Sequence, residues 1–166
     1  MKIPSLLSEK VTGSILRKAR QNLEKDGWLA PILFVGLANG KSMMAPLELP
    51  NSSKRRQMYF QQIGTQIRAN GKQILEAAFV SETWFINPQK VPGATRFPPG
   101  KHPARQEAVM VIGRNAANTL STQVIQPYTR GEGSRFVWEE YLVAEYEQPV
   151  ESGNRTVGLL DYLFDE

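Results

Sequence analysis

A stretch rich in proline and glycine divides this chain near its middle. Residues 87 to 105 contain five prolines and two glycines. Because proline fixes φ and lacks a backbone donor, this stretch can form neither a regular helix nor a central strand. The sequence therefore predicts a long loop here. A loop of this length is usually either functional or disordered, and the sequence leaves open whether it acts as a lid.

The chain has 166 residues, which is enough for one domain with its own hydrophobic core. No internal repeat or linker divides it, so we expect a single domain over residues 1–166. The net charge of +4 is typical of an ordinary solvated surface and does not require a nucleic-acid partner.

The rare residue types limit the chemistry that the chain can carry. It has no cysteine and one histidine, which argues against disulfides, thiolate nucleophiles and the usual zinc sites. We therefore expect no metal and no cofactor. The N-terminal apolar run is too short for a signal peptide, and residues 28–38 fall short of the roughly 20 residues that span a bilayer. The sequence predicts a cytoplasmic protein with no membrane partner.

Three segments have the pattern of helices. Residues 5–25 are amphipathic, with Ser5 or Ser8 as the N-cap and Asp26-Gly27 at the end. Residues 54–69 follow an N-cap at Asn51 or Ser52 and end at Asn70-Gly71. Residues 157–164 form a short terminal helix whose leucines must dock on another element.

The remaining segments read as strands. Asn39-Gly40 predicts a type I′ hairpin turn between residues 28–37 and 42–49, with Val35 facing Met44. Pro31 and Pro46 place one of these two strands at a sheet edge. Further strands are expected at 73–86, where apolar residues alternate, and at 107–114, 119–126 and 135–147, with a turn over 127–134.

This order of elements predicts an α+β fold. We expect a single antiparallel sheet of five or six strands with two or three helices. Placing the first strand beside the last gives the strand order 2-1-5-4-3, which is the profilin-like or PAS-like plan. Many functions occur on such sheets, so the plan by itself assigns none.

Candidate site residues gather around the proline-rich loop. If strands 73–86 and 107–114 pair, Glu82 and Trp84 lie near Arg105 and Glu107. One interpretation is a structural clamp in which Arg105 binds Glu82. The other is acid–base chemistry, with His102 as general base, Glu82 or Glu107 orienting it and Arg105 stabilising an anion. We favour the clamp.

The same residues form a pattern that resembles one in other proteins. The pattern Glu82-x-Trp84 followed by His102-Pro103-x-Arg105-x-Glu107 resembles a group of small bacterial and phage-type proteins of unknown function. It covers about the middle half of the chain. The resemblance implies no activity and points to the same residues.

Two basic segments suggest an alternative partner. Lys54, Arg55 and Arg56 begin the second helix, and the loop 87–105 carries four cations, among them Arg96. Free N–H groups of a helix start together with cations can bind phosphate, so a nucleic-acid-associated protein is one alternative. An enzyme using His102, Glu82 and Glu107 is another.

We interpret the chain as a binding or protein-interaction domain with no identifiable catalytic activity. Its expected partner is a protein, including a second copy of the chain, because the apolar strands at 28–49 include a sheet edge.

Overall fold

The computed structural model describes residues 5–86, 103–133, 135–146 and 158–165, and the features below concern these residues. They form three helices and seven strands in the order α1 (Glu9–Asp26), β1 (Ile32–Leu37), β2 (Ser42–Pro46), α2 (Ser53–Ala69), β3 (Ile74–Phe85), β4 (Gln106–Asn115), β5 (Ser121–Arg130), β6 (Phe136–Trp138), β7 (Leu142–Tyr146) and α3 (Gly158–Phe164).

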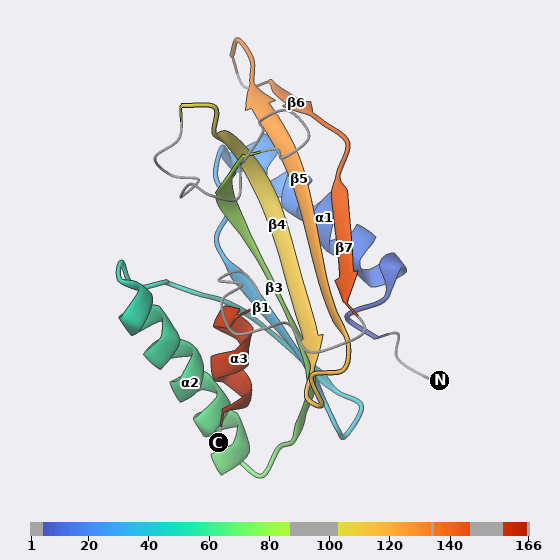
Figure 1. Cartoon of the computed structure of the whole chain (residues 1–166), viewed down its shortest axis with the longest axis vertical. Coiled ribbons are helices and arrows are strands. Elements are labelled where there is room, and N and C mark those ends of the chain that lie inside the picture. The colour runs from blue at the N-terminus through green and yellow to red at the C-terminus, as the bar shows by residue number, and fades with distance from the viewer. Residues whose placement is uncertain (1–4, 87–102, 134, 147–157, 166) are drawn as a thin grey trace.

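The strands form one antiparallel sheet with helices on both faces (Figure 1). Helix α1 packs on one face, where Leu16 and Leu23 join a core with Val80 and Val109. Helices α2 and α3 pack together on the other face, where a second core includes Phe60. The structure therefore confirms the predicted α+β class with a single antiparallel sheet.

The helix ends follow the caps expected from the sequence. The Ser8 side chain accepts a hydrogen bond from the Val11 N–H, and Gly27 ends α1 in the left-handed region with φ of 77°. Ser52 caps α2 by accepting from the Arg55 N–H at 3.2 Å. These contacts satisfy backbone groups that have no partner within the helix.

The β1–β2 hairpin is shifted by one residue from the predicted register, since Val35 pairs with Met43 rather than Met44. Leu37 N–H donates to Lys41 O at 2.9 Å, so three residues form the loop. Gly40 has φ of 82°, and Asn39 is not among the described residues with positive φ. A three-residue loop with glycine in the left-handed position is the next most common hairpin connection after the two-residue turn.

The strand order also differs from the predicted plan. It is β2-β1-β3-β4-β5-β6, with β7 also beside β5, so β1 lies next to β3 and not next to the last strand. Residues 77–80 of β3 are buried on both faces, which fits a central strand. In the last strands, Val137 and Val143 are more than half exposed, so these strands fit the sheet margin.

Pro127 lies where the last strands divide into two short pieces, whose registers against β5 differ by one residue. It lies inside β5, where a turn was expected, and its carbonyl accepts from the Glu139 N–H at 2.9 Å. A hydrogen-bonded pair in an antiparallel ladder has two bonds, but Pro127 has no N–H to donate to the Glu139 carbonyl. Instead, Gln126 Nε2 donates to Glu139 O at 3.3 Å. The sheet ladder is interrupted at this position, and β6 ends before β7 begins.

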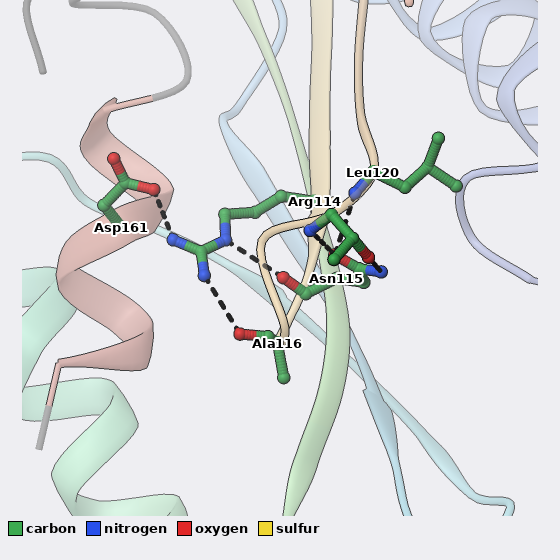
Figure 2. A network of polar contacts seen from close by, with 6 residues as sticks. Arg114, Asn115, Ala116, Leu120 and Asp161 are labelled. Atoms are coloured by element: carbon green, nitrogen blue, oxygen red, sulfur yellow. Dashed lines mark hydrogen bonds and ion pairs between the residues drawn. The ribbon is translucent and has the colours of Figure 1, made fainter. Parts of the chain in front are cut away.

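Helix α3 docks on α2 and on the end of β4. The Arg114 guanidinium contacts Asp161 of α3 and donates to Asn115 O and Ala116 O at 3.1 and 3.2 Å (Figure 2). Gly64 lets the α3 backbone approach, because an added Cβ would lie 2.0 Å from Leu163 O. The expected docking of the terminal helix is therefore present.

Candidate functional site

The pairing of β3 with β4 brings four predicted site residues to one end of the sheet. Trp84 lies directly opposite Glu107. The Arg105 guanidinium stacks over the Trp84 ring, 4.7 Å from its centroid. Glu82 lies one pair further along the same face. Two other predicted residues, Arg96 and His102, lie outside the described residues.

Glu82 is held by three groups, one from the segment that follows α1 and two from β5. Its Oε2 accepts from the Leu29 N–H at 3.0 Å, and its Oε1 accepts from the Tyr128 hydroxyl at 2.7 Å. Arg130 Nη2 lies 3.5 Å from the same Oε1. The carboxylate thus links the chain that follows α1 to the centre of the sheet.

Arg130 takes the position that the sequence interpretation gave to Arg105. Its Nε donates to Glu107 Oε2 at 2.9 Å, and its Nη1 donates to Gly27 O at 3.0 Å. The hydrogen bond to Glu107 is the main cause of the raised pKa of Arg130. The cation that meets Glu82 is therefore Arg130. The sequence interpretation missed it because residues 127–134 were assigned to a turn.

Tyr128 is 1% exposed, and burial raises its pKa above the ordinary tyrosine value, with the hydrogen bond to Glu82 acting in the same direction. A neutral phenol donates to the carboxylate, and the carboxylate is already bound on both oxygens. This arrangement suits a structural clamp better than a general acid or base. Among the described residues, no group of three or more His, Asp or Glu side chains is placed to hold a metal ion.

The three cations at the start of α2 are exposed. Arg56 Nε donates to Pro50 O at 2.7 Å, so this side chain closes the turn that precedes the helix. Arg56 and Glu82 line the same cavity of about 640 Å³, together with Ser81. The fold therefore brings these two predicted regions to the lining of one cavity.

The β2 edge is the most apolar exposed surface near the hairpin. Strand β2 is the first strand of the sheet, and Met43 and Met44 are 38% and 67% exposed. Beside it, between α1 and the strands β1 and β3, lies a groove of about 410 Å³ whose floor includes Ile32, Phe34 and Val80. The prediction of a sheet edge at the proline-marked hairpin is confirmed.

Comparisons with known proteins assign the chain to no family. No protein-family model matches the chain, and neither the curated proteins nor the solved structures gave a match. In the part of the chain that the structure describes, no helix combines the length and apolar character needed to cross a bilayer.

Proposed function

We propose that this chain is a protein-interaction domain that self-associates through the β2 edge. The observation that carries the proposal is the combination of an unpaired strand edge with Met43 and Met44 exposed on it. Sheet edges in monomeric proteins are usually blunted by charges, bulges or covering segments. The five residues of β2 include no charged residue.

The hydrogen-bond pattern of the hairpin indicates which backbone groups are free. Leu37 N–H bonds to Lys41 O, and Leu47 N–H bonds to Pro31 O. Because hydrogen-bonded and non-hydrogen-bonded pairs alternate in an antiparallel ladder, Ser42, Met44 and Pro46 form non-hydrogen-bonded pairs with β1. Their N–H and C=O groups point away from β1, toward the open edge. The N–H that Pro46 lacks would point away from β1, so the hairpin loses no hydrogen bond.

These free groups suit a second copy of the same strand. Two β2 strands related by a two-fold axis at Met44 run antiparallel. Met44 and the partner subunit's Met44 then exchange two hydrogen bonds, and each Ser42 N–H reaches the partner's Pro46 carbonyl. The two Met44 side chains meet across the axis on the α1 face. Methionine adapts well to such contacts because its side chain is flexible and polarisable.

Sedimentation equilibrium at micromolar concentration tests the proposal. We expect the wild type at twice 18.7 kDa. Met44→Lys should shift it to the monomer, since the two lysines would face each other at the axis. Met58→Lys is the matched control, because Met58 is 51% exposed on α2, which packs on the sheet face opposite α1.

Met44→Pro gives a second measurement, because it removes the outward N–H together with the methionine side chain and leaves in place the N–H groups of β2 that bond to β1. It should also yield a folded monomer by circular dichroism. A wild type that stays at 18.7 kDa at every concentration contradicts the proposal. A dimer that survives Met44→Lys contradicts it too.

A further inference from the structure

A second groove lies on the other side of α1, between this helix and the strands β5 and β7. Its volume is about 640 Å³, within the range of about 300–1,000 Å³ that small-molecule sites occupy. The walls are partly apolar, and their apolar members are Leu7, Leu16, Val124 and Val143. The groove is separate from β2, and none of its lining residues belongs to the proposed dimer edge.

The groove gathers buried polar side chains. Thr12, Thr122 and Gln126 all line it, and they are only 6%, 4% and 6% exposed. Across the described residues, six polar or charged residues are buried in total, so half of them lie here. Gln126 is bound to Glu139 O.

Neither threonine hydroxyl takes part in any hydrogen bond within the described structure, although both residues are more than nine-tenths buried. Ser121 Oγ is the one described side-chain oxygen that is both fully enclosed and without a partner. The hydroxyls of Thr12 and Thr122 therefore keep access to the groove. Polar groups that are nearly buried normally have hydrogen-bond partners. These two hydroxyls have none within the described residues, which leaves them available to a bound molecule.

Positive charge lies along the same groove. Arg17 and Arg20 line it with one acid, Glu9. The Arg20 guanidinium is held 4.8 Å from the centroid of the Trp138 ring, and the Trp138 indole donates to Glu24 at 2.8 Å. Arg17 forms no ion pair in the described part of the chain. The groove therefore presents an unneutralised cation beside an apolar floor.

We infer that this groove binds a small amphipathic anion. The apolar chain of the ligand lies along Leu16 and Val124, its carboxylate or phosphate head meets Arg17 and Arg20, and the hydroxyls of Thr12 and Thr122 supply hydrogen bonds. A charge-assisted contact to arginine is stronger than one between neutral groups. The inference does not depend on dimer formation.

Gly13 allows the groove to be blocked without disturbing the core. It lines the groove within α1, and a Cβ added there meets no atom within 4 Å. Gly13→Leu should fill the groove, while Gly13→Ala is the matched control that adds a single methyl group. Both replacements favour the helix over glycine, so neither should lower the melting temperature.

Isothermal titration calorimetry with decanoate, kept monomeric, tests the inference. We expect saturable binding to the wild type and to Gly13→Ala. Binding to Gly13→Leu should weaken at least about tenfold, which is a loss of about 1.4 kcal/mol. If neither decanoate nor decyl phosphate binds to the folded wild type, the inference is overturned. Equal binding to Gly13→Leu and the wild type overturns it as well.

The head group is tested separately with decanoate, decyl phosphate and decanol. Arg17→Gln should weaken both anions about threefold to tenfold and leave decanol binding unchanged. The tighter of the two anions identifies the head that the site prefers. If decanol binds as tightly as both anions, the groove is only apolar and the assigned role of Arg17 is wrong.

Discussion

The Tyr128 hydroxyl donates a 2.7 Å hydrogen bond to Glu82 Oε1, and this contact joins two strands that do not pair with each other. Strand β4 lies between β3 and β5, so the bond passes over one strand on the α1 face. The other oxygen of Glu82 binds the Leu29 N–H. A single carboxylate thereby ties the end of the helix layer to the sheet.

Removal of that hydroxyl should destabilise the fold without changing its shape. Tyr128→Phe keeps the buried ring and loses one hydrogen bond to a carboxylate. We expect a loss of about 1 to 2 kcal/mol in the free energy of unfolding, measured by urea denaturation. Tyr141→Phe is the control, because Tyr141 is 48% exposed. Equal losses in the two variants would contradict the importance of the bond.

The same tyrosine predicts a loss of stability at alkaline pH. Burial and Glu82 raise its pKa in the folded state, while in the unfolded chain it releases its proton near pH 10. Above that pH the folded state binds more protons than the unfolded state, so stability falls as pH rises.

Comparison with Tyr128→Phe isolates this contribution from those of the other titrating groups. The wild type should lose up to about 1.4 kcal/mol per pH unit more than the variant above pH 10, measured by urea denaturation between pH 9 and 11. Parallel curves for the two proteins would show that Tyr128 does not carry the effect.

The two helical glycines Gly13 and Gly64 should respond in opposite ways to alanine. Gly13→Ala should stabilise the protein by about 0.5 to 1 kcal/mol, because α1 is open at that point. Gly64→Ala should destabilise it by about 1 to 3 kcal/mol, since its Cβ would lie 2.0 Å from Leu163 O. Thermal denaturation of both variants checks the contrast. A stabilised Gly64→Ala protein would mean that α3 does not press on α2.

Asp161→Asn should loosen α3. It removes the charged partner of the Arg114 guanidinium, whose side chain is 7% exposed, and leaves two backbone carbonyls and the Phe164 ring. Because Asp161 is 38% exposed, we expect a moderate loss of about 1 to 3 kcal/mol. Hydrogen exchange should accelerate at the amides of α3 more than at those of β3. Uniform acceleration throughout the protein would argue against a local anchoring role.

Local signals in the sequence predicted the helices and the paired strands well. Ser8, Gly27 and Ser52 act as caps because their effect depends on neighbouring backbone groups alone. The alternation in residues 73–86 predicted β3, whose pairing with β4 placed Trp84 opposite Glu107. The caps and the alternation need no information about distant parts of the chain.

The errors arose where distant contacts decide the outcome. Asn39-Gly40 favours a two-residue turn in isolation, whereas the observed hairpin uses three residues. Pro127 normally signals a strand end, but here Gln126 supplies the missing donor and β5 continues to Arg130. The partner of Glu82 was missed for the same reason. The two grooves beside α1 depend on where the helix lies on the sheet, which periodicity does not report.

The observed strand order has a consequence for how quickly the chain can fold. Strands that follow each other in the chain pair in the sheet, apart from β3, which pairs with β1 after the crossing through α2, and β7, which pairs with β5. Pairing of the first strand with the last would require closing a loop of most of the chain, at a higher entropic cost. The meander lowers the contact order, and a lower contact order favours faster folding. Helix α3 is the exception, because Leu160 and Leu163 near the end of the sequence pack in one core with residues 33 to 79 and Ile112.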